Sequence, residues 1–562
     1  MGEWVYGEKR TTASIPSFPF SGLRFHPYTL SRSIPGACIP VAKMIMIRKP
    51  VARRLLPFAA FVGAALIFTV IYGISPLYTS NQNQYLLYGL ARGGMGWLRN
   101  DWMANTTDPV PLFSWLVYLT YRFLSVDWFY VYFAAAVGIY IYALSRIVFI
   151  LFDFSGSRLR QFSFFTGMAL IHSGFLKILI YEVSGKELLS LFYTGLAKQY
   201  VLAYEFQPSV FGVLLLLSIA LFLQKRYRGA VVLAVLAAAF HTGSLFSAGG
   251  LVLAYMAAIY LEKRALWPAL KPGLLALLLI APVLFYVVIH FDPFTGEKLA
   301  RAQHILNSFR TPHHLVTARW STESFWARIA IIIAGLACAQ GTRLFPVLAV
   351  STALAFLMTL LQILSGSDSL ALIYPWRISV ILVPLATALM VGRGIDMLFR
   401  RYADVTKRMA APLLRLNIAL LVLLLLGGAY TIYERFQAHA NDPARGMLNY
   451  VKTHARSGDQ YLIPSLELEQ LENFRLETGA PALVDFKAVP YRDADVLEWY
   501  ERISLARRFY RAPTIDCSLL RQIHRTYRIT HLVLETERFS ADCTFLKPVY
   551  RDGVFGVYEI GE

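Results

Sequence analysis

Long apolar runs constrain this chain more than any other feature of its sequence. A helix needs about 20 largely apolar residues to cross a bilayer, and such runs recur between residues 55 and 431. They predict eleven membrane-spanning helices, at 55–75, 127–151, 162–181, 209–224, 229–244, 246–261, 273–290, 326–340, 344–363, 372–391 and 412–431. The stretch 229–261 has basic clusters at both ends, which predicts a hairpin of two short helices.

The distribution of charge agrees with a membrane protein. Charged residues make up 16% of the chain, against about a quarter in an ordinary soluble domain. Residues 432–562 hold 17 basic and 19 acidic side chains, a net charge of −2. Because the whole chain has a formal net charge of +19, residues 1–431 have a net charge of +21. Because this surplus accompanies the apolar runs, it indicates Lys and Arg in cytoplasmic loops and argues against a nucleic-acid partner.

The same basic residues predict the orientation of the chain. Arg48, Lys49, Arg53 and Arg54 precede the first span and place the N-terminus in the cytoplasm. Alternating spans then put the loops 76–126, 182–208 and 292–325 outside, together with everything after residue 431. We therefore expect a multi-pass protein of the inner (plasma) membrane whose C-terminal domain is extracytoplasmic.

Three regions follow from these patterns. Residues 1–45 are rich in proline and lack an apolar period, so they are either a disordered tail or an extension that precedes the true start at Met44 or Met46. Residues 46–431 form the membrane domain. Residues 432–562 predict a soluble α/β domain, with strands at Gln460–Ile463, Thr530–Glu535 and Val554–Ile560 and helices near 494–509 and 516–526.

Two cysteines of this domain are candidates for a disulfide. Cys517 and Cys543 both lie in the region expected outside the cytoplasm, where an oxidising compartment permits the bond. The spacing alone leaves the pairing open, because sequence does not show whether their Cα atoms approach.

The loop 76–126 carries two candidate catalytic carboxylates, Asp101 and Asp108. A carboxylate just outside a span can act as a general base towards an acceptor hydroxyl, or can hold a divalent cation. Asp108 precedes Pro109, and Asp-Pro also suits the start of a helix, so helix capping competes with catalysis there. Asp101 has no such alternative, which makes it the better candidate.

Basic and polar residues of other loops are candidates for substrate binding. Arg310, His313 and His314 lie in one loop, and we expect them to donate hydrogen bonds to phosphate, since adjacent histidines usually diverge too far to share a metal ion. The alternative is an interfacial loop with polar tips. Further candidates, each with a structural alternative, are Glu205 and Arg377 at the starts of spans and Arg475 and Lys487 in the C-terminal domain.

Several common sites are missing from the sequence. It contains no Walker loop, dinucleotide-binding fingerprint, zinc-protease helix or nucleophile elbow. The missing nucleotide-binding loop argues against a primary pump.

The layout and several short motifs resemble a known superfamily. A long acidic loop after the first span, many further spans and a C-terminal α/β domain resemble the GT-C superfamily of integral-membrane glycosyltransferases. Four pieces, Asn81–Tyr85, Arg99–Trp102, Pro312–His314 and Phe474–Arg475 with Asp485–Lys487, look like a family of uncharacterised bacterial multipass proteins related to it. The resemblance implies a lipid-linked, polyprenyl-phosphate sugar donor and a carboxylate of the first loop, here Asp101 or Asp108, as base or metal ligand. Many members carry two acidic residues that are adjacent or nearly so, whereas Asp101 has no acidic neighbour.

Three functions remain open from the sequence. The first is a glycosyltransferase that uses a lipid-linked donor at the outer face of the membrane, with a divalent cation as an open question. The second is a transporter or flippase of lipid-linked saccharide, although the sequence shows no internal repeat. The third is a non-catalytic component of envelope polysaccharide assembly.

Overall fold

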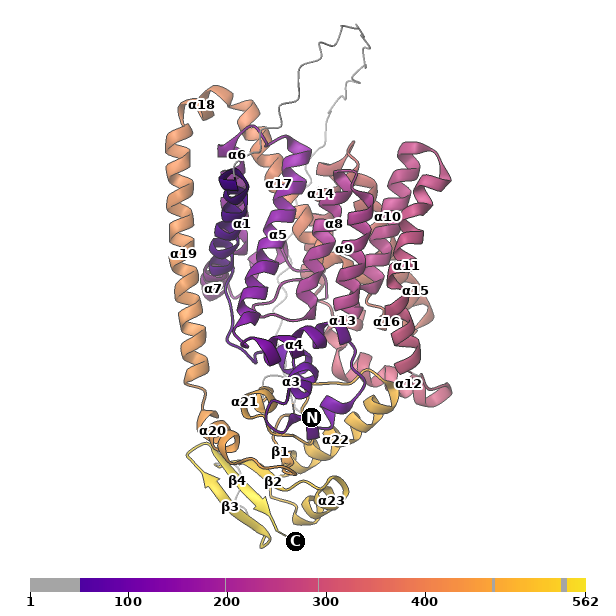
Figure 1. Cartoon of the computed structure of the whole chain (residues 1–562), viewed down its shortest axis with the longest axis vertical. Helices are drawn as coiled ribbons and strands as arrows, with labels where there is room; N and C mark the ends of the chain where they lie inside the picture. The colour runs from indigo at the N-terminus through magenta and orange to yellow at the C-terminus, as the bar shows by residue number, and fades with distance from the viewer. Residues whose placement is uncertain (1–50, 198, 292, 467–470, 537–542, 562) are drawn as a thin grey trace, which may run out of the picture. The chain divides into compact units, whose positions relative to one another are not determined.

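The computed structural model describes residues 51–197, 199–291, 293–466, 471–536 and 543–561. The expected N-terminal extension, residues 1–45, lies outside these described residues. From Leu55 onwards the described chain forms one compact unit, in which the apolar helices lie side by side (Figure 1).

Seven helical segments in the described part of the chain are long and apolar enough to cross a membrane. Their helices are α5 (Trp128–Phe152), α10 (Leu245–Lys263), α11 (Leu266–His290), α14 (Thr322–Ala339), α15 (Leu344–Ser365), α17 (Ser379–Arg401) and α19 (Ala410–Ala440). In α11, only 6% of the most apolar 18-residue stretch is buried inside the protein. A helix that is apolar on all sides and uncovered by protein needs a bilayer around it.

Other apolar helices are shorter or bent. A pair bent by 48°, α6 (Arg158–His172) and α7 (Gly174–Ser184), passes the same test when taken together. The helices α8 (Val213–Leu223) and α9 (Tyr227–Phe240) have apolar stretches shorter than a full span. In α1 (Val51–Tyr72), the described apolar stretch begins at Phe58. The stretch 229–261 does consist of two helices, α9 and α10. Of the eleven predicted spans, seven coincide with helices that pass this test in the described residues, and the bent pair makes an eighth. The three spans predicted at α1, α8 and α9 stay predictions.

Short helices lie between the apolar helices along the chain. They are α2 (Gln82–Tyr85), α3 (Leu87–Gly93), α4 (Pro111–Phe123), α12 (Gly296–His304), the π-helical η6 (Ile305–Arg310), α13 (Pro312–Leu315), α16 (Asp368–Leu372), η8 (Pro375–Ile378) and α18 (Ala403–Arg408). Short 3₁₀ turns η1 (Leu98–Asn100), η2 (Met103–Asn105), η3 (Leu188–Phe192), η4 (Pro208–Gly212), η5 (Thr242–Ser244) and η7 (Thr317–Arg319) complete the connections.

The C-terminal region contains a small sheet covered by helices, as the sequence predicts. Its elements are α20 (Arg445–His454), β1 (Tyr461–Leu462), α21 (Phe474–Thr478), α22 (Asp493–Arg511), α23 (Cys517–Tyr527), β2 (His531–Glu535), β3 (Leu546–Arg551) and β4 (Phe555–Ile560). The strand order is β1-β2-β4-β3, with β1 parallel to β2 and the other pairs antiparallel. Strand β3 was not predicted. It contains Pro548, which an edge strand tolerates.

The C-terminal core extends into the loop that follows α11. Ala302, Ile305 and Leu306, from α12 and η6, are buried in the same apolar cluster as Trp499 of α22. The ring of Phe309 packs edge-on against Trp499 at a centroid distance of 5.8 Å. This packing fixes the position of Arg310, the next residue, relative to the C-terminal region.

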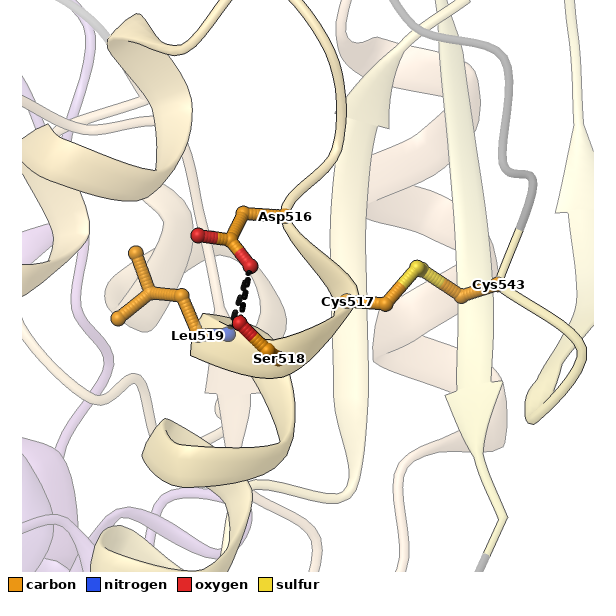
Figure 2. The surroundings of a disulfide bond; sticks show 5 residues. All are labelled: Asp516, Cys517, Ser518, Leu519 and Cys543. Carbon is orange, nitrogen blue, oxygen red and sulfur yellow. Dashed lines mark hydrogen bonds between the residues drawn. A yellow bond between two sulfur atoms is a disulfide. The ribbon is translucent and has the colours of Figure 1, made fainter.

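The two cysteines named above form a disulfide (Figure 2). Their Cα atoms are 5.7 Å apart, and the bond joins the first residue of α23 to the segment before β3. Asp516 caps the same helix, because its Oδ1 accepts the backbone N–H of Leu519 at 2.9 Å.

Reduction of this disulfide is expected to destabilise the C-terminal region. The bond closes a loop with a sequence separation of 26 residues, and a loop of that length corresponds to about 3 kcal/mol of unfolded-state entropy. The variant Cys517→Ser with Cys543→Ser should therefore unfold at a lower temperature than the oxidised protein. Cys338→Ser, which removes the free cysteine of the described residues, is the control. Equal melting temperatures for both variants and the unmodified protein would contradict this expectation.

Candidate functional site

A cavity of about 580 Å³ lies where three segments, distant in sequence, meet. We call it the cationic cavity, and its wall includes Arg377 and parts of the segments Asn81–Tyr85, Arg310–His314 and Lys487–Tyr491. Gln84 joins two of these segments, because its Nε2 donates to the backbone oxygen of Val489 at 3.1 Å. Five of the predicted substrate-binding residues line this cavity: Arg310, His313, His314, Arg377 and Lys487.

Arg310 is a buried cation held by an uncharged partner. Its side chain is 7% exposed, its Nη2 donates to the backbone oxygen of Lys487 at 2.7 Å, and its guanidinium lies 5.2 Å from the ring centre of Phe486. Its Nε is buried and has no hydrogen-bond partner among the described residues. Burial lowers the pKa of Arg310 from its ordinary value. A buried guanidinium without a carboxylate is costly, so the site is suited to an anionic ligand.

Arg377 and Lys487 add two more cationic groups. Arg377 is half-buried, forms no ion pair with a described carboxylate, and has tyrosines as its main electrostatic neighbours. Lys487 is 8% exposed, and its Nζ lies 3.9 Å from Oε2 of Glu472. Among the described residues that line the cationic cavity there is no Asp or Glu. The cavity therefore has a net positive lining.

The two histidines lie together, contrary to the expected divergence. Their ring centres are 4.0 Å apart. Burial, followed by the neighbouring His313, lowers the pKa of His314 to about 3, so its ring is neutral near pH 7. His314 Nδ1 lies 2.6 Å from the backbone oxygen of Ala197, which can only accept, so Nδ1 carries the proton. Its Nε2 is then a hydrogen-bond acceptor.

Polar groups that the sequence did not single out as binding residues complete the wall. They include Asn81, Gln84, Tyr85, Tyr200, Gln207, Tyr374 and Tyr491. Asn81 donates to the hydroxyl of Tyr200 at 3.1 Å, and the hydroxyls of Tyr85 and Tyr491 are 3.4 Å apart. The polar run Asn81–Tyr85 was the only sequence signal for this wall, because aromatic residues near apolar helices are equally typical of the membrane interface.

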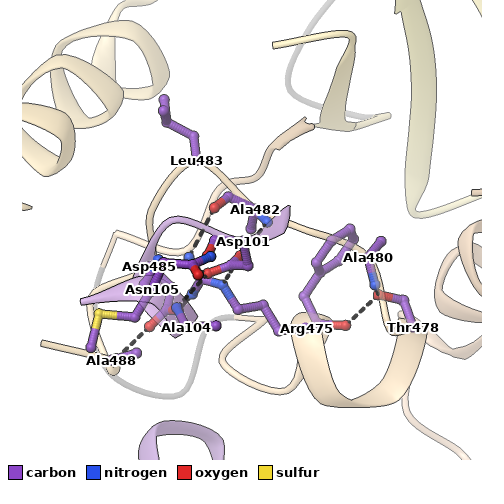
Figure 3. Close-up of polar contacts among 12 residues, drawn as sticks. Asp101, Ala104, Asn105, Arg475, Thr478, Ala480, Ala482, Leu483, Asp485 and Ala488 are labelled. Atoms are coloured by element: carbon purple, nitrogen blue, oxygen red, sulfur yellow. Dashed lines mark hydrogen bonds and ion pairs between the residues drawn. The ribbon is translucent and has the colours of Figure 1, made fainter. Parts of the chain in front are cut away.

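Asp101, the first catalytic candidate, lies outside this cavity in a buried ion-pair cluster (Figure 3). Its Oδ2 accepts from Nε of Arg475 at 2.6 Å and from the backbone N–H of Ala482 at 2.9 Å. Its Oδ1 accepts the backbone N–H of Met103 at 2.9 Å, and the residue is 0% exposed. Both carboxylate oxygens therefore have donors.

Arg475 also pairs with Asp485, and this second contact leads to the cavity. Asp485 Oδ1 accepts the backbone N–H of Ala488 at 2.6 Å, so it holds the turn that carries Lys487. We call Asp101, Arg475 and Asp485 the anchor cluster. In the structure it connects the loop 76–126 to the C-terminal region and positions one wall of the cationic cavity.

The remaining candidates, Asp108 and Glu205, are buried and do not line the cationic cavity. Asp108 Oδ2 is 3.2 Å from Nη2 of Arg92, and its Oδ1 accepts the N–H of Val110, which forms a turn before α4. Burial raises the pKa of Asp108. Burial likewise raises the pKa of Glu205 from 4.5 to about 7, because Lys487 offsets only part of the desolvation. Glu205 Oε1 is buried without a hydrogen-bond partner among the described residues.

The described residues contain no group of three or more His, Cys, Asp or Glu side chains that could hold a metal ion.

One family model matches the chain. A domain of unknown function (DUF6798) matches residues 443–506, a stretch that begins just before α20 and ends within α22. Arg475, Asp485 and Lys487 all fall within the match. No curated protein matches the chain. The matched domain thus contains two members of the anchor cluster and one wall of the cationic cavity.

The anchor cluster predicts a large loss of stability for Asp101→Ala. This change leaves the N–H groups of Ala482 and Met103 without their acceptor, and breaking a buried ion pair costs about 3–5 kcal/mol. We expect a lower melting temperature and faster proteolysis of the C-terminal region. Glu559→Ala, which removes an exposed carboxylate of β4, is the control. A stable Asp101→Asn protein that has lost activity would instead support the catalytic role predicted from sequence.

Glu205 predicts a pH dependence of stability. Its pKa is higher in the folded protein than in the unfolded chain, so its contribution is fully present below pH 4.5 and is lost as the pH rises through about 7. The shift corresponds to about 3 kcal/mol. The stability of Glu205→Gln relative to the wild type should therefore increase between pH 4.5 and pH 8, as measured by thermal unfolding in nanodiscs. The exposed Glu182→Gln should show no such trend, and parallel curves for all three proteins would refute the assignment.

Proposed function

We propose that this protein is an integral-membrane transferase of the glycosyltransferase C type, which transfers a sugar from a polyprenyl-phosphate donor. One observation carries the proposal: Arg310, Arg377 and Lys487 converge on one cavity whose described lining holds no carboxylate. The resemblance in layout and motifs adds to it.

The electrostatics of the cavity suit a phosphate. Guanidinium groups offer several N–H donors in a planar fork that matches phosphate oxygens. Arg310 has an unpartnered buried Nε, and Arg377 has no ion pair with a described carboxylate. A phosphate bound between them would supply the acceptors and the negative charge that the protein itself leaves out.

The place of the cavity suits a lipid-linked ligand. Its lining includes Leu245 and Phe246 at the start of α10 and Val287 near the end of α11. The helix α11 is largely uncovered by protein, so a ligand chain beside it would lie in lipid. A polyprenyl chain would then lie on the apolar side of the cavity, and its phosphate on the cationic side.

The proposal includes an orientation. The cavity lies among residues of loops 76–126, 182–208 and 292–325, which the basic residues place outside the cytoplasm together with the C-terminal domain. We propose that transfer occurs at the outer face of a bacterial inner membrane, with the N-terminus inside and eleven spans formed by the seven long helices, the bent pair and the three shorter ones.

The chemistry would proceed by attack of an acceptor hydroxyl on the anomeric carbon of the donor. The new C–O bond forms as the bond from that carbon to the phosphate oxygen breaks, and the phosphate leaves with the electron pair. Arg310 and Arg377 would stabilise the charge that develops on the leaving phosphate. Asp101 would position the wall through the anchor cluster, since both its oxygens already have donors.

Binding of farnesyl phosphate tests the phosphate site. Purified full-length protein in nanodiscs should bind farnesyl phosphate and not farnesol. The loss of a hydrogen bond to a charged group costs roughly 1.5–3 kcal/mol, so Arg310→Gln and Arg377→Gln should each weaken binding by roughly 10- to 100-fold. Arg319→Gln, which removes an exposed charge from the same loop, should bind like the wild type. Equal binding of farnesyl phosphate and farnesol would refute the proposal.

Transfer of label separates the enzyme from the alternatives. Membranes of the source cell that lack this protein would receive the purified protein and polyprenyl-phosphate sugar with a labelled sugar. Incorporation of label into product supports a transferase. Movement of the intact labelled donor across liposomes without transfer supports a flippase, and binding without either supports a non-catalytic assembly component.

A further inference from the structure

A second cavity, of about 560 Å³, shares Lys487 with the cationic cavity. Its lining includes Ser80, Asp442, Glu472, Asn473, Lys487 and Glu535. We call it the acidic cavity. Lys487 lines both cavities, and Ser80 in the acidic cavity adjoins Asn81 in the cationic one. The two cavities therefore meet at this lysine.

The two cavities have opposite charge. Asp442, Glu472 and Glu535 line the acidic cavity, and against them stand only Lys487 and His439 among the described lining residues. His439 Nε2 is also 3.0 Å from Oε1 of Glu477. An anion would be repelled by the three carboxylates, whereas hydroxyl groups could donate hydrogen bonds to them. The lining therefore favours a neutral, hydroxyl-rich molecule over a second phosphate.

Glu472 has one oxygen committed to the protein and one facing Lys487. Its Oε1 accepts the backbone N–H of Ser80 at 2.7 Å and the side-chain amide of Asn83 at 3.4 Å, which fixes the carboxylate. Its Oε2 lies 3.9 Å from Nζ of Lys487 and is buried without a hydrogen bond to any described residue. A buried acceptor left without a donor costs about 1–3 kcal/mol, and a ligand hydroxyl would remove that cost.

We infer that the acidic cavity binds the acceptor, a neutral hydroxyl-bearing saccharide, and that Glu472 receives the proton of its attacking hydroxyl. The inference rests on the proposed function. The acceptor oxygen bonds to the anomeric carbon as the carbon–phosphate oxygen bond breaks, and the acceptor proton passes to Glu472 Oε2. The polyprenyl phosphate keeps the electron pair and stays beside Arg310 and Arg377. Lys487, between the cavities, orients the carboxylate on one side and attracts the leaving phosphate on the other.

Glu472→Gln tests the proton acceptor. Glutamine keeps the shape and an oxygen for the Ser80 N–H but cannot take a proton, and loss of a general base lowers rates by roughly 100- to 10,000-fold. We expect the variant to bind farnesyl phosphate like the wild type and to lose sugar transfer in the membrane assay above. Glu559→Gln, an exposed carboxylate of the same region, should keep both. Wild-type transfer by Glu472→Gln, or loss of its farnesyl phosphate binding, would overturn the inference.

A reversible block tests the cavity without altering Glu472. In Asn473→Cys, on a background of Cys38→Ser and Cys338→Ser, the new thiol would line the acidic cavity. Labelling with a bulky methanethiosulfonate should abolish transfer, leave farnesyl phosphate binding unchanged, and be reversed when a mild reductant removes the label. Glu559→Cys, labelled in the same way, controls for the reagent and for the native disulfide. Undiminished transfer by labelled Asn473→Cys would overturn the inference.

These measurements separate the two levels of the proposal. If the wild type binds no farnesyl phosphate and transfers no sugar, the proposed function fails, and the acceptor site with it. If the wild type binds and transfers but the blocked Asn473→Cys protein also transfers, only the acceptor site fails.

Discussion

The buried anchor cluster is the interaction on which the geometry of the site depends. Two carboxylates, Asp101 and Asp485, share the guanidinium of Arg475. Each of these three residues is at most 3% exposed. Removing one partner from such a cluster leaves an uncompensated buried charge, so the arrangement resists separation of the loop 76–126 from the C-terminal region. Since Lys487 follows Asp485 by two residues, the ion pair also determines where the shared lysine of the two cavities stands.

The cavities on either side of that lysine differ in charge more than in size. One gathers Arg310, Arg377 and Lys487 without a described carboxylate, and the other is lined by three carboxylates. An anionic phosphate would thus be directed to the cationic cavity, and a neutral hydroxyl compound to the acidic cavity. Displacement with inversion needs this separation, because the acceptor hydroxyl attacks the anomeric carbon on the face opposite to the departing phosphate.

Much of the fold could be predicted from local patterns. The apolar runs located the helices of the membrane region, and the alternation of residues located three of four strands, because both signals depend on neighbours in the sequence. The fourth strand, β3, was not predicted because it contains Pro548, and proline disfavours a central strand. The position of β3 at the edge of the sheet tolerates the proline. The long helix α19 continues to Ala440, nine residues past the boundary expected at residue 431. Its last turns are polar and therefore resemble the start of a soluble domain, which is why the sequence placed the boundary too early.

By itself, the sequence determined that the chain is helical and apolar enough for a membrane, and that Arg310, His313 and His314 share one loop. It also supplied the residue types of a phosphate site. Only the tertiary structure decided which of them meet. Asp101 and Arg475, 374 residues apart, pair with each other away from the cationic cavity, while Glu472 and Lys487 reach Ser80 from the far end of the chain. The physical reason is that burial and charge pairing arise from long-range packing, which no local pattern encodes.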